Sequence, residues 1–403
     1  MDDEPDVGGL LHTRDVARWG PPGVIWEPTV LERARLIQTF AYLCVSVYTS
    51  AVLWRLDMTD RTSALRVGLA GVTGYAGFEA WRLLAGHPHF EVVRLAAGRG
   101  AGTTLADSWP ALGPGATMPI EALTTGFAAD LDVLVLALPH GLSAPYLAGL
   151  QAEGLLDGIR VLDLGGDFRL RDTGTYAKAY GARHPCPELL DHAVYGLTEV
   201  HRAAIADAPL VANPGCYPTA TTLGARVLLA AGCGGPVHTS CVSGVSGAGR
   251  KASARTRYCE VQDSVVAYGV GGTHRHVPEM EQELCCPVIF TPHLVPTIRG
   301  MLATVTMASP SELTQERLHE LAVSMYADEP LVVVRNTPPA TRDVRGTGLT
   351  HVHVRLDPER ETSQAFVAID NLGKGAAAQG LQNLNVMFGL PETMGIPTIP
   401  LLP

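Results

Sequence analysis

The sequence carries little charge and contains no long run of Lys or Arg. Charged residues make up 17% of its 403 residues, and the formal net charge is −10. A chain without a basic patch is not expected to bind nucleic acid. Its hydrophobic content of 46% excludes a disordered chain and predicts a sizeable core. At this length we expect two domains and a smaller appendage.

The sequence also lacks the paired cysteines that are typical of zinc sites and disulfide frameworks. Its eight cysteines form no C-x-x-C pair, and no secretory signal peptide opens the chain. These absences predict a cytoplasmic protein with reduced thiols, most of them in the core, and no metal site. The cysteines are at positions 44, 186, 216, 233, 241, 259, 285 and 286.

Long hydrophobic runs are nearly absent as well. Residues 36–54 contain no charge and lie between Arg35 and Arg55, which makes the run just long enough to cross a bilayer. Its Gln, Thr, Ser and Tyr residues make it weakly hydrophobic, so we do not expect a membrane span. A peripheral helix, or a stretch upstream of a translation start at Met58, explains it as well. We interpret residues 1–64 as an N-terminal extension, either disordered or outside the natural protein.

Strand and helix patterns alternate through residues 65–212. Apolar runs typical of buried parallel strands are separated by helical spacing such as that of residues 77–87. The runs are residues 65–71, 90–98, 131–141 and 159–168. This order predicts an α/β protein with a Rossmann-type, doubly wound parallel sheet.

The pattern changes at residue 213. Strand patterns follow one another with few helices until residue 371, which predicts an α+β catalytic and oligomerisation domain with a mixed or antiparallel sheet. These patterns are residues 236–247, 286–296, 300–307, 331–336 and 349–357. Residues 372–403 begin with a helical pattern, and we expect this helix to return to the first domain.

The segment GLAGVTGYAGFE places Gly71, Gly74 and Gly77 three residues apart between a strand and a helix. Glycines let the backbone approach a pyrophosphate, and the helix N-terminus supplies N–H donors. The next strand is followed by Arg99 rather than by Asp or Glu, which favours the 2′-phosphate of NADP. The alternatives are a tight turn without a ligand and a solvated surface arginine.

The segment VANPGCYPTA contains a cysteine in a turn between an apolar strand and a helix. Pro214 and Gly215 interrupt regular structure, and Thr219 can begin a helix. Free N–H groups at a helix N-terminus stabilise a thiolate, so the pattern predicts a lowered pKa for Cys216. The alternative is a small buried cysteine packed under a loop.

Two further segments carry polar groups. The loop SGVSGAGRKAS, residues 243–253, contains Arg250 and Lys251, which can hold an anion; a mobile surface loop is the alternative. His274 and His276 are two residues apart, so an extended chain directs both to one side. They can serve as acid/base groups, metal ligands or polar surface, and metal binding is the least expected of these.

Nine segments together resemble the N-acetyl-γ-glutamyl-phosphate reductase family, a relative of aspartate-semialdehyde dehydrogenase. They follow the family's order over about four-fifths of the chain. The segments are GVTGYAGFE, LPHG, DFRLRD, YGLTE, NPGCYPTA, SGVSGAGR, HRHVPE, TPHLVPTIRGM and DNLGKGAAAQGLQNLN. The turn AAGRGAG differs from the serine-rich turn that is typical of the family at this place. This difference affects how a 2′-phosphate is held.

The resemblance implies an enzyme of arginine biosynthesis that uses NADPH to reduce a small acyl phosphate to a semialdehyde through a cysteine thioester. It implies that Cys216 is the nucleophile and His276 the acid/base group, with His274 assisting. Together with Arg99, the expected cofactor residues are Gly71, Thr73, Gly74, Tyr75, Gly77, Pro139, His140, Gly141, Asn371 and Lys374. The expected substrate residues are Ser243, Gly244, Arg250 and Arg299. A homodimer or homotetramer is also implied.

Two other functions fit the same residues. One is a reductase of the same fold that acts on aspartyl phosphate or on a carrier-bound aminoadipyl phosphate. The other is a catalytically silent NADP-binding protein that uses Cys216 as a reversible redox switch.

Overall fold

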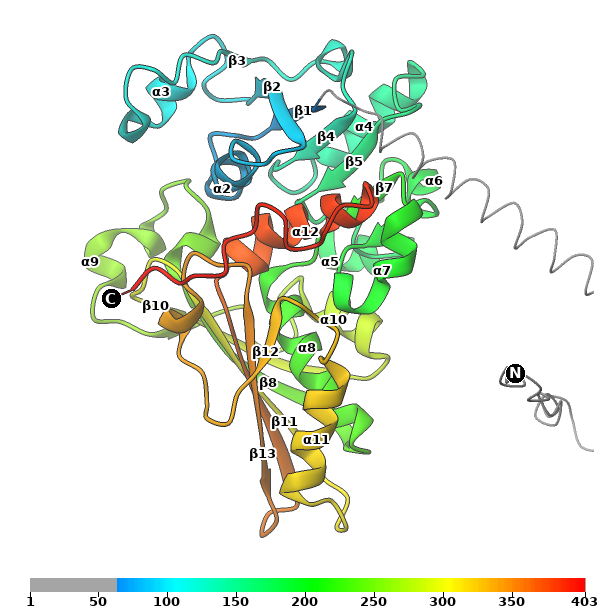
Figure 1. Ribbon diagram of the computed structural model, residues 1–403, viewed down its shortest axis with the longest axis vertical. Coiled ribbons are helices and arrows are strands. Elements are labelled where there is room, and N and C mark those ends of the chain that lie inside the picture. The colour runs from blue at the N-terminus through cyan, green and yellow to red at the C-terminus, as the bar shows by residue number, and fades with distance from the viewer. Residues whose placement is uncertain (1–63, 403) are drawn as a thin grey trace, which may run out of the picture. The chain divides into compact units, whose positions relative to one another are not determined.

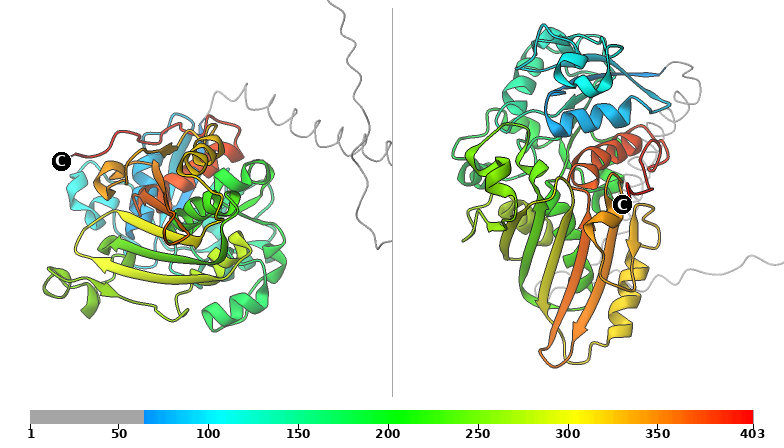
Figure 2. Two further views of the ribbon diagram at one scale, coloured as in Figure 1. Left: turned by 90° about the horizontal axis from the view of Figure 1, so that it is seen from below. Right: turned by 90° about the vertical axis from the view of Figure 1, so that its left-hand side faces the viewer.

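Two seven-stranded sheets organise the chain (Figure 1). The computed structural model of the protein describes residues 64–402, which belong to one structural unit. The N-terminal extension, with its apolar run 36–54, lies outside the described residues. Figure 2 shows the sheets at opposite ends of this unit, with the C-terminal helix α12 (Ala378–Met387) between them.

The first sheet is wholly parallel, which confirms the predicted Rossmann-type fold. In spatial order its strands are β3 (Ile120–Glu121), β2 (Phe90–Ala96), β1 (Leu65–Ala70), β4 (Val133–Leu136), β5 (Arg160–Asp163), β7 (Leu210–Ala212) and β6 (Ala193–Tyr195). Its helices are α2 (Tyr75–Leu84), α3 (Leu105–Ser108), α4 (Ser143–Ala152), α5 (Thr173–Tyr180), α6 (Pro187–Leu190) and α7 (Thr198–Asp207). The strand order reverses between β1 and β4, so the loops that follow these two strands open a crevice in which ligands bind.

The second sheet is mixed, as predicted. In spatial order its strands are β12 (Val332–Val334), β13 (Thr350–Asp357), β14 (Thr362–Ile369), β11 (Met301–Ala308), β8 (Gly234–Gly244), β10 (Val288–Val295) and β9 (Val266–Ala267). The pairs β8–β10 and β12–β13 are parallel, and the other pairs are antiparallel. The helices here are α8 (Cys216–Ala230), α9 (Tyr258–Val261), α10 (Val277–Leu284) and α11 (Gln315–Met325).

The core of the second half lies on one face of this sheet. Burial alternates along β10 and β11, as in a sheet with one covered face. Phe290 and Val305 on the covered face share a core with Leu223 of α8 and Leu318 of α11. Ile289 lies on the other face and is 51% exposed. The sequence predicted five of these strands but neither β9 nor β14. It also did not predict the length of α8, because the small residues of this helix carry a weak helical pattern.

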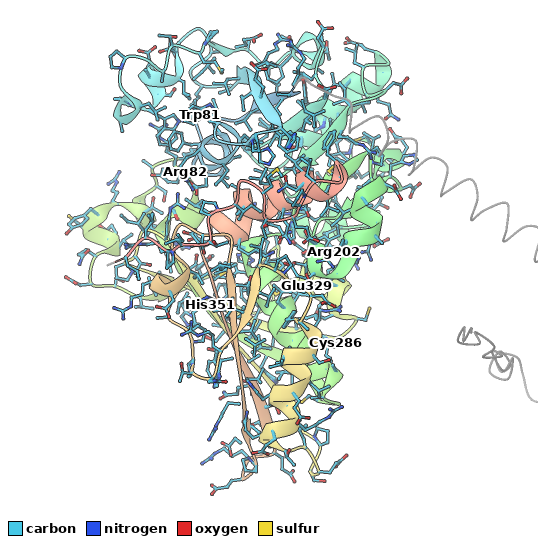
Figure 3. The ribbon with its side chains drawn as sticks, viewed as in Figure 1. Trp81, Arg82, Arg202, Cys286, Glu329 and His351 are labelled. Carbon is cyan, nitrogen blue, oxygen red and sulfur yellow. The ribbon has the colours of Figure 1, made fainter. Side chains whose placement is uncertain are left out.

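The C-terminal segment joins the two halves. A π-helical turn (Gly373–Ala377) leads into α12, which packs against α2, α7 and β5. Arg202 of α7 lies beside Glu329, which follows α11 (Figure 3). Its Nη1 donates to Glu329 Oε1 at 3.1 Å, and its Nε pairs with Glu392 beyond α12.

Candidate active site

Cys216 is the first residue of α8, and a loop of three residues joins it to β7. The structure thus has the strand-to-helix turn that the sequence predicts at this cysteine. Gly215 is the N-cap residue, and no described side chain caps the helix there. Gly375 of the C-terminal segment lies against Cys216, because a Cβ on that glycine would lie 2.7 Å from the Cβ of Cys216. Cys216 therefore lies where both halves and the C-terminal segment meet.

His276 approaches the turn before Cys216 from the second half, at the N-cap of α10. A Cβ on Gly215 would lie 2.6 Å from both Nε2 and Cε1 of the His276 ring. The ring is 7% exposed, and its Nδ1 has no hydrogen-bond partner among the described residues. The structure therefore brings His276 directly beside the residue that precedes Cys216.

Arg169 lies on the other side of His276 and was not singled out from the sequence. Its Nη1 lies 3.5 Å from His276 Nε2, and its Nε donates to the carbonyl of Asn213 at 2.8 Å. The guanidinium is buried, and a second nitrogen donates to the carbonyl of Leu164 at 3.1 Å. Arg169 thus places a fixed positive charge between the loop before Cys216 and the imidazole.

Glu279 completes this buried cluster and was also missed. It is 1% exposed and accepts hydrogen bonds from the backbone N–H of Gly215 at 2.7 Å and from Tyr195 Oη at 2.8 Å. Arg169 Nη1 lies 3.4 Å from its other oxygen. The available signal was its place one helical turn after His276, in the segment HRHVPE. Glu279 fixes the turn before Cys216 and neutralises Arg169.

His274 contacts the backbone of His276, whereas the ring that lies against Gly215 is that of His276. The backbone N–H of His276 donates to His274 Nδ1 at 3.2 Å. The His274 ring packs edge-on against Tyr217 and Phe290. Burial lowers the pKa of His274 to about 4, and Arg275 adds to this effect. His274 is therefore neutral at physiological pH and holds the backbone that carries His276.

The predicted lowering of the Cys216 pKa is wrong. Burial raises the pKa of this thiol to about 11, and Arg169 and the backbone N–H groups of Cys216 and Tyr217 oppose the rise only in part. Burial also lowers the pKa of His276 well below its usual range, and Arg169 adds to that effect. At neutral pH the free protein therefore holds a protonated thiol at Cys216 and a neutral imidazole against the preceding residue, Gly215. A neutral imidazole can accept the thiol proton when a substrate arrives.

The glycine loop after β1 has the shape that a dinucleotide needs. Gly71 has φ +94°, and a Cβ there would collide with the backbone of Ala137. A Cβ on Gly77 would collide with the carbonyl of Gly71. Gly74 is the N-cap of α2, and no described side chain caps that helix. The loop that holds Thr73, and the first turn that begins at Tyr75, thus leave space and N–H donors for a pyrophosphate.

The turn after β4 is held by a buried carboxylate. Gly141 has φ +83°, and its N–H donates to Asp167 Oδ1 at 2.7 Å. His140 Nδ1 lies 2.7 Å from the same oxygen, and its ring stacks on Tyr180 with centroids 3.7 Å apart. This turn, which begins at Pro139, lies beside the glycine loop at the β1–β4 crevice. Arg99 follows β2 and is exposed.

A second cluster forms where β8 ends. Asn371 Oδ1 accepts from the N–H of Gly300 at 2.8 Å, and its Nδ2 donates to Ser246 Oγ at 2.9 Å. A Cβ on Gly244 would lie 2.8 Å from the carbonyl of Ile298, so only glycine fits there. The structure thus gathers Asn371, Gly244 and the buried Ser243 around one pair of loops.

Two other predicted site residues have structural partners of their own. Arg299 Nη2 lies 2.7 Å from Glu79 Oε2 on α2, and its Nη1 lies 3.4 Å from Asp370 Oδ2. Lys374 is fully buried, and its ammonium pairs with Glu199 and donates to Gln382. Both residues bridge elements of the fold, so their placement does not support the predicted substrate and cofactor contacts.

Within residues 64–402, no three His, Cys, Asp or Glu side chains lie close enough together to hold a metal ion. No helix in this part of the chain has the length and apolarity needed to span a bilayer. The seven cysteines in this range are all free thiols.

A Rossmann sheet with a glycine loop, joined to a mixed-sheet half whose first helix begins with a cysteine, defines the class of the semialdehyde dehydrogenases. Residues 66–208 match the family model described as the NAD binding domain of semialdehyde dehydrogenase. Residues 216–371 match the model described as its dimerisation domain.

Curated relatives show to which family of semialdehyde dehydrogenase-like proteins the chain belongs. N-acetyl-gamma-glutamyl-phosphate reductase from Halorhodospira halophila is 45% identical over 353 residues, which cover 84% of this chain and 100% of the relative. The enzyme of that name from Symbiobacterium thermophilum is 44% identical and covers 82% of this chain and 97% of its own. The chain belongs to the N-acetyl-gamma-glutamyl-phosphate reductase family, which confirms the resemblance seen in the sequence.

Solved structures share the fold. Aspartate semialdehyde dehydrogenase II from Vibrio cholerae, complexed with ASA, has a TM-score of 0.60 at 18% identity and covers 81% of this chain and 98% of its own. Aspartate semialdehyde dehydrogenase with NADP from Candida albicans has a TM-score of 0.59 at 16% identity and covers 81% and 99%.

Proposed function

We propose that the protein catalyses the NADPH-dependent reduction of N-acetyl-γ-glutamyl phosphate to N-acetylglutamate semialdehyde, with release of phosphate, in arginine biosynthesis. The observation that carries the proposal is the placement of Cys216 at an uncapped helix N-terminus, with the neutral, buried His276 against the preceding residue, Gly215. The glycine loop after β1 and the curated relatives support the cofactor and the substrate.

The nucleophile is activated by its neighbour. His276 takes the thiol proton as the sulfur of Cys216 attacks the acyl carbon. The bond between that carbon and the phosphate oxygen then breaks, and the acyl group stays on the sulfur as a thioester. Free N–H groups at the start of α8 can bind the carbonyl oxygen as it gains charge. His276 holds the proton beside the thioester.

Bound NADPH supplies the hydride that reduces the thioester. When the carbon–sulfur bond breaks and the aldehyde leaves, His276 returns its proton to the sulfur of Cys216. Arg169 disfavours a lasting charge on the imidazole, so the return of the proton is favourable. We assign His274, Arg169 and Glu279 to positioning, because they fix the backbone and ring of His276 and the turn at Gly215.

We assign the cofactor to the β1–β4 crevice. The glycine loop would hold its pyrophosphate, and the turn from Pro139 to Gly141 would lie near its nicotinamide end. The cluster of Ser243, Gly244 and Asn371 is the best candidate to bind the substrate. For Asn371 this differs from the cofactor contact that the family resemblance implies.

The direct test is a spectrophotometric assay in the reverse direction. Wild-type protein receives N-acetylglutamate semialdehyde, NADP and phosphate, with aspartate semialdehyde as the rival substrate. We expect phosphate-dependent formation of NADPH with the first substrate alone. Faster turnover of aspartate semialdehyde would favour another acyl phosphate, and no turnover despite NADPH binding would favour the silent redox protein.

A matched pair of variants tests the covalent step. Cys216→Ser should abolish turnover and leave NADPH binding unchanged, because only the nucleophile is lost. Cys259→Ser, at an exposed thiol, should keep full activity. Retained turnover in Cys216→Ser would overturn the thioester route.

We also propose that the protein is a cytoplasmic homodimer or homotetramer. The face of the second sheet that carries Ile289 is not covered by the helical layer that buries Phe290, and the matching family model is described as a dimerisation domain. A second copy of the chain would cover this face. Light scattering should give a multiple of the chain mass, and Thr304→Arg on the same face of β11 should shift it toward the monomer.

A further inference from the structure

Arg250 reaches from the second half of the molecule to the glycine loop. It follows β8 and the short turn Val245–Ala248. Its Nη1 donates to the carbonyl of Thr73 at 3.0 Å, and its Nη2 donates to the carbonyl of Ser108 at 2.9 Å. The family resemblance implies a substrate residue here, but these partners belong to the dinucleotide-binding half.

A tryptophan places the guanidinium. Arg250 Cζ lies 4.0 Å from the centroid of the Trp109 ring, a cation–π contact. The indole N–H of Trp109 donates to the carbonyl of Val72 at 3.0 Å. Trp109 and Arg250 thus bind two consecutive carbonyls of the glycine loop. Because the N–H of a trans peptide points away from its carbonyl, these bonds fix the direction of the loop's donors before a ligand arrives.

The charge of Arg250 has no counter-charge in the described part of the chain. No carboxylate of residues 64–402 pairs with it, whereas Glu79 and Asp370 neutralise Arg299. A guanidinium has five N–H donors, and the two bonds to carbonyls leave the others free. An unneutralised guanidinium beside a phosphate-binding loop favours an anionic partner.

The position of the Arg250 guanidinium indicates which anion it binds. The turn after β2 lies close by, because a Cβ on Gly100 would lie 3.3 Å from Thr73 Cγ2 and 3.4 Å from Ser108 Oγ. In Rossmann-type folds the residues after the second strand lie at the 2′ position of the adenosine ribose, and an arginine there accommodates a 2′-phosphate. Arg250 contacts the same two residues that border this turn.

We infer that Arg250 binds the 2′-phosphate of NADPH, so that a loop of the second half selects NADPH over NADH. This rests on the proposed function only in taking a dinucleotide as the cofactor. The turn after β2 does not have the serine-rich sequence that is typical of the family, and its one charged side chain is the exposed Arg99. A 2′-phosphate contact from Arg250 explains how the protein can still favour NADPH.

The test compares nucleotides that differ only in the 2′-phosphate. Binding of 2′,5′-ADP and 5′-AMP is measured by calorimetry, and binding of NADPH and NADH by fluorescence, for wild type, Arg250→Gln and Arg250→Lys. Arg250→Gln should raise the Kd of 2′,5′-ADP and NADPH about 10- to 100-fold, the range expected for lost hydrogen bonds to a charged group. The Kd of 5′-AMP and NADH should change less than about twofold, because these nucleotides lack the 2′-phosphate. The Kd values of Arg250→Lys should fall between those of wild type and Arg250→Gln, because lysine keeps the positive charge but lacks the paired N–H donors of the guanidinium.

Arg257→Gln is the matched control, since Arg257 is an exposed arginine in the same segment. It should bind all four nucleotides as wild type does. Equal losses for NADPH and NADH in Arg250→Gln would overturn the inference and leave Arg250 as a support of the loop. An unchanged Kd for 2′,5′-ADP with a raised KM for phosphate in the reverse assay would overturn it in favour of a substrate role. Because 2′,5′-ADP binding needs no turnover, failure of the proposed reaction would be seen separately, as an inactive wild type.

Discussion

Gly215 and His276 touch so closely that only a glycine fits at the position before Cys216. A Cβ at position 215 would lie 2.6 Å from His276 Nε2 and 2.9 Å from Arg169 Nη1, distances that real Cβ atoms essentially never show. The backbone of Gly215 is not strained, with φ −70° and ψ 151°. The glycine is therefore required by the close approach of the His276 ring, not by the conformation of the turn.

Gly215→Ala should therefore abolish catalysis without unfolding the protein. The methyl group would displace the His276 ring or the Arg169 guanidinium, and misplacement by about 1 Å can cost on the order of 100-fold in rate. We expect kcat to fall at least about 100-fold, with NADPH affinity unchanged, in steady-state kinetics and fluorescence titration. Gly86→Ala is the control, because a Cβ there meets nothing within 4 Å. A wild-type kcat in Gly215→Ala would show that catalysis does not depend on the close approach of the His276 ring to residue 215.

The raised pKa of Cys216 makes a second prediction, for the free protein. With a pKa of about 11, the thiolate fraction is small at neutral pH and rises about tenfold for each pH unit up to about pH 10. Alkylation of Cys216 by iodoacetamide should follow this slope when it is measured by mass spectrometry of the Cys216 peptide. A plateau that begins below pH 8 would contradict it and would support the lowered pKa that the sequence predicts.

Local patterns in the sequence predicted the parts of the site that depend on local structure. The glycine loop and the cysteine at a strand-to-helix turn are both visible in short segments, because turns need particular residues at particular places. The direction of the Cys216 pKa shift was not visible, because it depends on burial, to which Gly375 of the C-terminal segment contributes from a distant part of the sequence.

Arg169 and Glu279 were missed for the same reason. Each lies in a segment that was recognised, but neither segment shows that the two side chains meet 110 positions apart in sequence. Most of the longer strands were predicted, from continuous apolar runs in the parallel sheet and from alternation in the mixed sheet, whereas β14 and most of α8 were not identified. Side-chain partners across the two halves require the folded chain.

The ion pair between Arg299 and Glu79 leads to a prediction about stability. Glu79 is 2% exposed, and removing Arg299 leaves its carboxylate with Arg82 alone. Arg299→Gln should lower the free energy of unfolding by about 2 kcal/mol at pH 7, measured by urea denaturation. The KM for substrate should stay unchanged; a raised KM in a variant of wild-type stability would instead support the predicted substrate role.

The pH dependence of this difference has a definite sign. Burial acts to raise the pKa of Glu79, but hydrogen bonds and charges from Arg82 and Arg299 outweigh it and hold the pKa below its ordinary value. The folded-state pKa is thus depressed, so the contribution is fully present above the ordinary value near 4.5 and is lost as pH falls through the folded pKa. The difference between wild type and Arg299→Gln should therefore be constant from pH 7 to about 5 and should shrink below pH 4.

Lys374 leads to the last prediction, because the structure makes it a buried support. Its ammonium pairs with Glu199, which is 1% exposed, so Lys374→Met leaves an uncompensated buried carboxylate. We expect a loss of about 3–5 kcal/mol in the free energy of unfolding, and Lys178→Met, at an exposed lysine, should lose almost nothing. Adding Glu199→Gln to Lys374→Met removes the orphaned charge and should restore most of the stability. In that folded double variant NADPH should bind as in wild type, because the Lys374 ammonium faces Glu199 and Gln382. A weakened NADPH affinity there would establish the cofactor contact that the family resemblance implies.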